Sequence, residues 1–298
     1  MTSCDSRTDT EVVLNSGMRM PIVGYGTYQI PSTSEGMEAM ENALQTGYRL
    51  LDCASFYNNE SMIGKVISKQ YRSNLFIVSK VWNDAIYHGP DAVRASCLQS
   101  INDLQCGYLD LYLIHWPVPD KHIEAYKTLV QLRKEGLVKD IGVSNYTIED
   151  IQALESAGLP LPSVNQIEIS PFLNRTTTIN YMRSKGIVPM SYRGLRNATA
   201  LQDPTILKIA QQLSVTTAQV LGRWLVQNGI CHIPKSVHLE RMRSNFDLFS
   251  FELNPQQMQL LNSLTSTETL EAFRVRHLEK IIGHTPLVGS GDIRFTVE

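Results

Sequence analysis

The sequence predicts a closed barrel of eight parallel strands that alternate with helices, built as one domain. Eight short runs are apolar on both faces, as expected for strands of a parallel sheet that is covered on both sides. Helical patterns separate these runs, which recur roughly every 25 to 45 residues, the spacing of strand–helix units. The length of 298 residues, with no Pro-, Gly- or Ser-rich linker, suits a single barrel of this kind over residues 1–298.

The elements can be placed in order along the chain. The expected strands cover 21–26, 48–52, 75–80, 109–115, 138–145, 163–170, 186–192 and 229–236. Apolar residues three and four positions apart predict helices over 37–44, after Asn59, over 93–104, 122–135, 203–213 and 216–228, and after His238. Gly47 and Gly107 are placed to end two of these helices, and Asn58 or Asn59 can cap the second. The pattern is that of a (β/α)₈ or TIM barrel.

Two segments fall outside the eight units. Residues 11–20 carry an Asn-Ser-Gly turn between apolar stretches, which predicts an N-terminal β-hairpin that plugs the bottom of the barrel. Residues 266–298 predict an extra C-terminal helix, over 267–281, followed by a Gly-rich tail that can wrap over the top. Residues 1–10 are expected to be flexible.

An open, doubly wound sheet is the competing fold, and the glycine pattern disfavours it. No G-x-G-x-x-G motif follows a strand and opens a helix: Gly24-Tyr25-Gly26 lacks the third glycine, and Gly289-Ser290-Gly291 lies in the tail. A phosphate-binding G-x-x-x-x-G-K-[ST] loop is also absent from the sequence.

Composition excludes several classes of protein. Hydrophobic residues make up 43% of the chain and charged residues 19%, which excludes a disordered chain. The 27 basic and 29 acidic residues give a net charge of −2 without a basic block, so neither nucleic acid nor a membrane is an expected partner. The first residues lack the apolar run of a secretion signal, and the five cysteines contain no C-x-x-C pair. We therefore expect a cytoplasmic protein with reduced thiols.

Polar and reactive residues gather at the ends of the expected strands, where barrel enzymes build their sites. They are Asp52, Lys80, His115, Ser144, Asn145, Asn165, Gln166, Glu168, Tyr192, Lys235 and Ser236. Asp52 and Lys80 are tolerable after buried strands if they form an ion pair, which by itself can be purely structural. Tyr57 lies five residues after Asp52, so its hydroxyl can fold back over the barrel mouth.

Asp52, Tyr57, Lys80 and His115 together suit a proton-donor site. A phenol is a poor acid at neutral pH, and an adjacent ammonium lowers its pKa while a carboxylate holds the ammonium in place. An imidazole can hydrogen-bond a carbonyl oxygen and orient it. No side chain can donate hydride, so reduction by this site requires a cofactor.

A second cluster follows the last strand. Lys235 and Arg241 flank the start of the helix after His238, with Asn245 on the same face as Arg241. Basic residues at a helix N-terminus form an anion site, and the alternative is a solvated basic patch. The remaining histidines have no spacing typical of metal ligands, so no metal is expected.

The sequence resembles the aldo-keto reductase family. The matching segments are GYGTY (24–28), GYRLLDCASFYNNE (47–60), VSKVW (78–82), LDLYLIHWP (109–117), GLVKDIGVSNY (136–146), VNQIE (164–168), TTAQVLGRW (216–224) and IPKSVHLERMRSNF (233–246). The resemblance implies a monomeric barrel that reduces aldehydes or ketones with NADPH. It assigns Tyr57 as proton donor, Lys80 and Asp52 as the pair that tunes it, and His115 as the residue that orients the carbonyl.

The resemblance also implies the residues that bind the cofactor and the substrate. The NADPH residues would be Thr27, Asp52, Ser144, Asn145, Gln166, Tyr192, Leu195, Lys235, Ser236, Val237, Arg241 and Asn245. In the family, the last strand and its helix hold the 2′-phosphate, residues matching Ser144, Asn145 and Gln166 bind the carboxamide, and an aromatic matching Tyr192 stacks on the nicotinamide. The substrate residues would be Tyr28, Trp82, His115 and Trp116, which favour apolar or aromatic carbonyl compounds.

The sequence departs from the family at three places. Arg193-Gly194-Leu195-Arg196 stands where the family usually has Ser-Pro-Leu-Gly, so either arginine is a candidate for a phosphate contact. Ser244 stands where a glutamate often holds the adenine. The loop after His115 is short, which predicts an open substrate pocket.

Two other functions remain compatible with the sequence. One is a nucleotide-sensing or structural protein on the same barrel, which would bind NADPH without turnover. The other is a cofactor-free isomerase that uses Lys80 and Tyr57, which would not bind NADPH.

Overall fold

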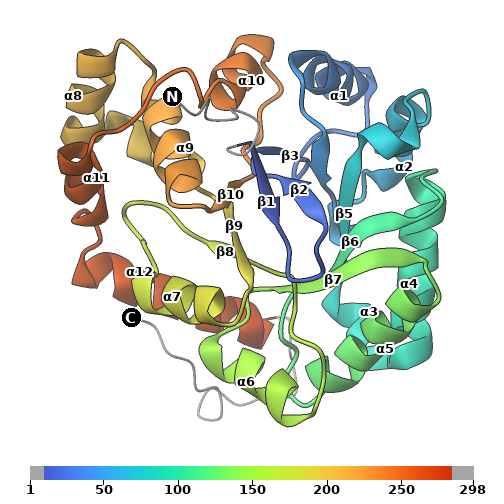
Figure 1. Ribbon diagram of the computed structural model, residues 1–298. Helices are drawn as coiled ribbons and strands as arrows, with labels where there is room; N and C mark the ends of the chain where they lie inside the picture. The colour runs from blue at the N-terminus through green and yellow to red at the C-terminus, as the bar shows by residue number, and fades with distance from the viewer. Residues whose placement is uncertain (1–9, 284–298) are drawn as a thin grey trace, which may run out of the picture.

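The computed structural model describes residues 10–283 and shows a barrel of eight parallel strands inside a ring of helices (Figure 1). The strands are β3 Gly24–Gly26, β4 Leu50–Asp52, β5 Phe76–Val81, β6 Leu109–Ile114, β7 Val138–Ser144, β8 Val164–Glu168, β9 Val188–Tyr192 and β10 Cys231–His232. Each overlaps its predicted run, and neighbours in the chain are neighbours in the sheet. The predicted fold class is confirmed.

The first and last strands close the ring through a short seam. Val23 forms a parallel bridge with His232, and His232 N donates to Ile22 O at 2.8 Å. Gly26 N donates to Pro234 O at 3.0 Å. The first strand is therefore hydrogen-bonded to the last strand and to the segment that follows it.

Most helices were predicted from apolar spacing. These are α1 Ser34–Thr46, α2 Glu60–Ile67, α4 Pro90–Asp103, α5 His122–Lys134, α8 Pro204–Leu213, α9 Thr217–Gln227, α10 Leu239–Phe246 and α12 Thr267–Gly283. Four more had no predicted range: α3 Asn83–His88, α6 Ile148–Ser156, α7 Thr176–Ser184 and α11 Pro255–Asn262. Capping boxes begin α6 (Thr147 with Asp150) and α11 (Asn254 with Gln257), and each was visible in the sequence.

The helix ends test the capping predictions. Gly47 ends α1 with φ 118° and donates to Ala43 O and Leu44 O, as predicted. The prediction for Gly107 is wrong, because α4 has Leu104 as its C-cap and Gln105 already has φ 50°. Asn59 is the N-cap of α2, yet its Nδ2 donates to Thr27 O and Ile30 O, so its side chain joins loops instead of capping the helix.

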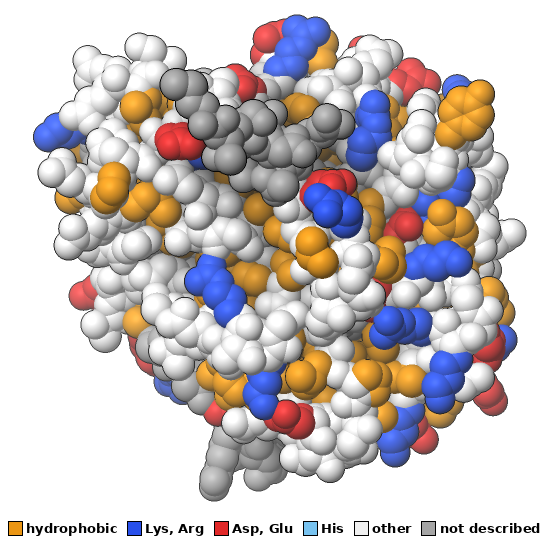
Figure 2. Space-filling view, viewed as in Figure 1, with side chains coloured by type: hydrophobic (Ala, Val, Ile, Leu, Met, Phe, Trp, Pro, Cys, Tyr) orange, Lys and Arg blue, Asp and Glu red, His pale blue; other side chains and the backbone are white. Residues whose placement is uncertain are grey.

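A hairpin seals the N-terminal end of the barrel, as predicted. Strands β1 Glu11–Val13 and β2 Arg19–Pro21 pair antiparallel in front of the barrel (Figure 1). Leu14 and Met20 pack with the inward-facing strand residues, among them Leu111 and Leu113 of β6. Tyr112 and Ile114 of the same strand face the helices, in the cluster of buried residues that includes most of the helical core. Figure 2 shows charged and hydrophobic side chains interspersed on the hairpin face.

The C-terminal helix α12 packs across the other end of the barrel. Its Phe273 ring lies 4.7 Å from the Arg175 guanidinium, and Arg276 Nη2 lies 3.5 Å from Glu168 Oε1 at the end of β8. The predicted flexible residues 1–9 and the predicted tail over 284–298 lie outside the described residues. Within residues 10–283, no helix combines the length and hydropathy required to span a membrane.

Candidate functional site

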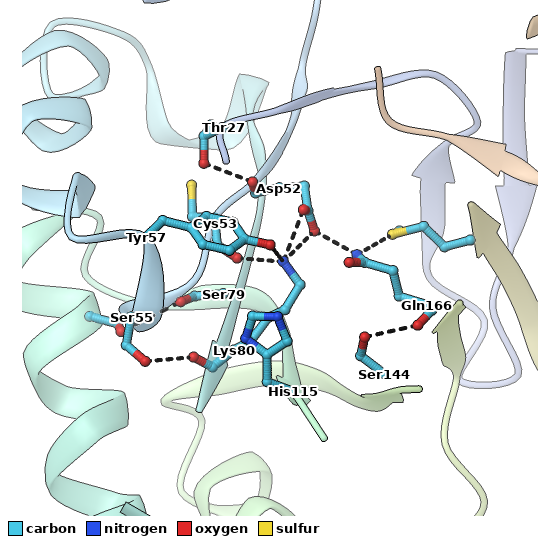
Figure 3. Close-up of polar contacts among 12 residues, drawn as sticks. Thr27, Asp52, Cys53, Ser55, Tyr57, Ser79, Lys80, His115, Ser144 and Gln166 are labelled. Atoms are coloured by element: carbon cyan, nitrogen blue, oxygen red, sulfur yellow. Dashed lines mark hydrogen bonds and ion pairs between the residues drawn. The ribbon is translucent and has the colours of Figure 1, made fainter. Parts of the chain in front are cut away.

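Lys80 lies at the centre of the predicted proton-donor site. Its Nζ donates to Asp52 Oδ2 at 2.9 Å, to Cys53 O at 2.7 Å and to Tyr57 Oη at 3.2 Å (Figure 3). The ammonium therefore has three acceptors for its three protons, one of them a carboxylate. This arrangement makes a charge tolerable on a side chain that is 0% exposed.

Local structure brings Tyr57 back over this ammonium. Asp52 ends β4, and the chain then forms the 3₁₀ turn η2 Ser55–Tyr57. Ser55 Oγ donates to Lys80 O at 3.0 Å, which ties this turn to β5. Asn58 ends the turn in the left-handed conformation with φ 54°, so the Tyr57 hydroxyl is held over the barrel.

His115, the fourth predicted residue, follows β6 and lies beside Tyr57. The two ring centroids are 5.8 Å apart with an interplanar angle of 78°. Trp82 contacts the His115 ring edge to face at 4.9 Å. The structure thus brings together all four residues predicted for catalysis.

The expected effect of Lys80 on the pKa of Tyr57 is not the dominant one. Burial of the phenol raises its pKa well above the ordinary value, and the Asp52 carboxylate raises it further. The predicted net lowering of this pKa is therefore wrong, because desolvation of the phenolate outweighs the nearby cation. Tyr57 is held protonated at neutral pH.

The residues predicted to bind the carboxamide form one network with Asp52. Gln166 Nε2 donates to Asp52 Oδ1 at 2.7 Å, and Ser144 Oγ donates to Gln166 O at 2.8 Å. Asn145 Nδ2 donates to His115 O at 3.0 Å and to Ser144 Oγ at 3.1 Å. Tyr192 Oη donates to Asn145 Oδ1 at 2.6 Å, which places its ring at the same mouth.

Thr27 supports the network through the backbone of Asp52. It is fully buried, and its Oγ1 donates to Asp52 O at 2.9 Å. The hydrogen bond fixes the backbone of the carboxylate that pairs with Lys80. A direct contact of Thr27 with a cofactor stays a prediction.

The second predicted cluster lies between β10 and α10. Lys235 and Arg241 are exposed and, among the described residues, neither forms an ion pair, whereas Arg243 of the same helix pairs with Glu240 at 2.8 Å. Ser236 is buried, and its Oγ accepts a hydrogen bond from His238 N at 3.1 Å. Asn245 is buried and Val237 half-buried on the same segment.

Two tyrosines that had no predicted role hold this segment on the barrel. Tyr25 Oη donates to Ser236 O at 2.5 Å, and Tyr48 Oη donates to Met242 O at 3.0 Å. The Tyr48 ring also lies 4.8 Å from Phe246. Their signal in the sequence was a tyrosine on or just before an otherwise apolar strand, which resembles an ordinary core residue.

The predicted aromatic walls differ in their access to solvent. Tyr28 is 50% exposed and its ring lies 5.1 Å from Tyr57. Phe56, which was not predicted, stacks on Trp82 at 3.8 Å and is 39% exposed. Trp116 is only 6% exposed, and the ring of His277 in α12 lies 5.3 Å from its ring, centroid to centroid. Helix α12 therefore covers Trp116, and the open pocket expected from the short loop stays a prediction.

The structure also shows what the residues that depart from the family pattern contact. Arg193 Nη1 lies 3.5 Å from Glu168 Oε2, and the Arg196 guanidinium lies 5.3 Å from the Phe172 ring. Both arginines have positive φ, 54° and 47°, before and at the start of η4 Arg196–Gln202. Leu195 between them is half-buried. Ser244 Oγ lies 2.7 Å from Thr216 Oγ1, so it joins α10 to the start of α9.

Residues 10–283 contain no group of three His, Cys, Asp or Glu side chains placed to hold a metal ion.

Comparison with known proteins gives consistent matches over most of the chain. The family described as the Aldo/keto reductase family matches residues 22–266. An aldo-keto reductase of Mycolicibacterium smegmatis is 40% identical over 264 residues, which cover 87% of this chain and 94% of the relative. The glyoxal reductase of Bacillus subtilis is 35% identical over 259 residues, covering 86% and 93%. A crystal structure of a Gox0644 variant in complex with NADPH is 36% identical, covers 87% and 95%, and has a TM-score of 0.84.

Proposed function

The chain belongs to the aldo/keto reductase family, and we propose that it reduces aldehydes or ketones to alcohols with NADPH, using Tyr57 as the proton donor. The single observation that carries the proposal is the position of Lys80 Nζ, 3.2 Å from Tyr57 Oη and 2.9 Å from Asp52. A structural ion pair alone needs no phenol above it. The half-buried Tyr57 therefore supports chemistry at this mouth.

The residues present fit a nicotinamide dinucleotide. When bound, NADPH supplies the hydride that no side chain can supply. The buried hydroxyl and amide groups of Ser144, Asn145 and Gln166 suit a carboxamide, and the Tyr192 ring suits a flat heterocycle. Lys235 and Arg241, which are exposed cations beside the start of α10, suit a phosphate.

The described residues account for the proton transfer. His115 orients the carbonyl oxygen, and Tyr57 donates its proton to that oxygen as the oxygen gains negative charge. The hydrogen bond from Lys80 stabilises the phenolate that remains, and Asp52 keeps Lys80 in place. General acid catalysis of this kind contributes about 10²- to 10⁴-fold in rate.

A donor must carry its proton before the reaction, and a phenol does so at neutral pH. Burial raises the pKa of Tyr57, which makes the phenol a weaker acid, so the proton transfer depends on stabilisation of the phenolate. Lys80 then acts mainly on the phenolate that forms during the transfer, where a preorganised cation stabilises the developing charge.

We propose apolar or aromatic carbonyl compounds as the substrate class. Tyr28, Phe56 and Trp82 present aromatic surface near Tyr57 and His115. The similarity to a glyoxal reductase adds small dicarbonyl compounds to the candidates. By the family resemblance we further propose a monomeric, cytoplasmic enzyme, which size-exclusion chromatography and cell fractionation can test.

The direct test is turnover by the purified protein. Mixed with NADPH and a reactive aromatic aldehyde, it should consume the absorbance of the reduced nicotinamide. A panel of aldehydes, ketones and dicarbonyl compounds should then rank the substrates. Tight NADPH binding without turnover over the whole panel would refute the reductase and favour a nucleotide-sensing protein, while failure to bind NADPH would favour a cofactor-free isomerase.

A further inference from the structure

Glu60, the first residue of α2, is a buried carboxyl that the proton transfer described above does not use. The residue is 5% exposed, and its Oε1 accepts a hydrogen bond from Ser79 Oγ at 2.5 Å. Ser79 Oγ lies 3.5 Å from Ser100 Oγ, so polar contacts link the start of α2 to β5 and α4. A buried carboxyl costs free energy that an apolar residue at this place would avoid, which calls for a specific role.

The position of Glu60 connects the two halves of the proton-donor site. Glu60 follows Tyr57 by three residues, and Ser79 directly precedes Lys80 in β5. The contact between Ser55 Oγ and Lys80 O holds the other end of the same loop. The loop that carries Tyr57 is thus fixed on both sides of the phenol to the strand that carries the ammonium.

We propose that Glu60 is a positioning residue of the proton-donor site, which holds Tyr57 at hydrogen-bonding distance from Lys80 through its contact with Ser79. The carboxyl contacts Ser79 instead of the reacting groups, so it acts through the loop and the strand. This inference rests on the proposed function, because it assigns Glu60 a part in the reaction of Tyr57.

The charge of Glu60 gives the proposal a second, electrostatic readout. The groups that interact with its carboxyl through charge or hydrogen bonds are Cys53, Tyr57, Ser79, Lys80, Cys97, Ser100, Asp103 and Tyr112. Burial raises the pKa of Glu60 and Asp103 raises it further, while Ser79, Ser100 and Lys80 lower it. An ionised Glu60 raises the pKa of Tyr57, so loss of this charge should move the alkaline fall in activity to lower pH.

Two variants of Glu60 separate its effect on the position of Tyr57 from the effect of its charge on the pKa of Tyr57. Glu60→Leu removes the acceptor of the Ser79 hydrogen bond, and kcat should fall about 10- to 100-fold because the phenol is misplaced. The Kd for NADPH, measured by quenching of protein fluorescence, should stay within about twofold, the scatter expected for an independent site. Glu60→Gln keeps an acceptor oxygen, so kcat should recover most of this loss while the alkaline limb moves to lower pH.

The matched control is Asp140→Asn. Asp140 is also a fully buried carboxyl that accepts a hydrogen bond from a serine, Ser16, but it lies at the hairpin end of the barrel. Its variant should lower the unfolding temperature and leave both kcat and the pH profile unchanged. Should Glu60→Leu fail to fold, Ser79→Ala removes the same hydrogen bond and should lower kcat in the same direction.

An unchanged kcat in Glu60→Leu, or a Glu60→Gln protein as slow as Glu60→Leu with no shift in its pH profile, would overturn the proposal. A crystal structure of Glu60→Leu tests the same point without activity. The separation of Lys80 Nζ and Tyr57 Oη should exceed hydrogen-bonding distance, about 3.5 Å, and an unchanged 3.2 Å would overturn the proposal. Absence of turnover in the unaltered protein would instead refute the proposed function, and this distance would still decide the role of Glu60.

Discussion

Among the described residues, a largely buried ion pair lies at each end of the barrel, and the two pairs differ in what surrounds the cation. At the mouth, Lys80 pairs with Asp52, with side chains 0% and 3% exposed. At the hairpin end, Arg72 pairs with Asp110 at 2.6 Å, with side chains 21% and 11% exposed. Arg72 also donates to the carbonyl oxygens of Cys106, Leu75 and Tyr108, and Ile77 N donates to Asp110.

The two cations differ in the groups, other than the carboxylate, that contact them. Arg72 donates its other hydrogen bonds to backbone carbonyls and lies over the face of the Tyr108 ring, 3.8 Å from its centroid. Lys80 donates one of its hydrogen bonds to a phenol hydroxyl, that of Tyr57. Burial of an ion pair is thus a poor sign of chemistry by itself, and a titratable hydroxyl hydrogen-bonded to the cation is a better one.

The largest expected effect comes from removing that phenol hydroxyl. Tyr57→Phe leaves the Lys80–Asp52 pair in place but removes the proton donor, so kcat should fall about 10²- to 10⁴-fold. The Kd for NADPH should not change, and both quantities can be measured on one preparation. Turnover equal to that of the unaltered protein would mean that the Lys80–Asp52 pair has a structural role only, like the Arg72–Asp110 pair.

Breaking the pair at the hairpin end should give the opposite result. Arg72→Met leaves Asp110 buried without its cation, and the free energy of unfolding should fall by roughly 2–3 kcal/mol, less than for a fully buried pair. Urea denaturation measures this loss, and kcat below the unfolding range should be unchanged. A large fall in kcat with little loss of stability would show that the two ends are coupled.

The comparison extends to the segment between β10 and α10, where Lys235 and Arg241 form no ion pair among the described residues. Arg241→Ala should raise the Kd for NADPH about tenfold and leave that for NADH unchanged, because only NADPH carries the 2′-phosphate. Arg243→Ala on the same helix removes a cation that already pairs with Glu240, and it serves as the control. Equal effects on both cofactors would remove Arg241 from the phosphate site.

The comparison can also be made at a carboxyl: Asp150 accepts hydrogen bonds from a hydroxyl and a backbone N–H instead of from a cation. Burial raises its pKa to about 6, while its hydrogen bonds with Thr147 lower it. A carboxyl with a raised pKa stabilises the fold below its unfolded pKa and loses that contribution as pH rises through about 6. Asp150→Asn keeps the capping box, so it should stabilise the protein by about 1 kcal/mol at pH 7 and less near pH 4. Thermal unfolding at the two pH values decides this, and a destabilised protein at pH 7 would contradict it.

The strands and the four residues of the proton-donor site could be predicted because their signals are local. Asp52, Lys80 and His115 end or follow apolar runs, and parallel strands bring such ends together. The stacking of Phe56 on Trp82 and the cover of Trp116 by His277 could not be predicted, since they depend on how a loop and the last helix pack. The pKa shift at Tyr57 was predicted in the wrong direction for the same reason. A sequence can indicate which charged residues lie nearby, whereas desolvation depends on the whole surrounding structure.

The seam between β3 and the two-residue β10 has a consequence for synthesis on the ribosome. Residues 22–26 emerge early, but their partners at 232 and 234 come more than two hundred residues later. Until then both sheet edges, at β3 and at β9, carry unpaired backbone groups that can recruit other chains. A nascent chain that stalls before residue 232 is therefore an open sheet, and it should depend on chaperones far more than the finished protein does.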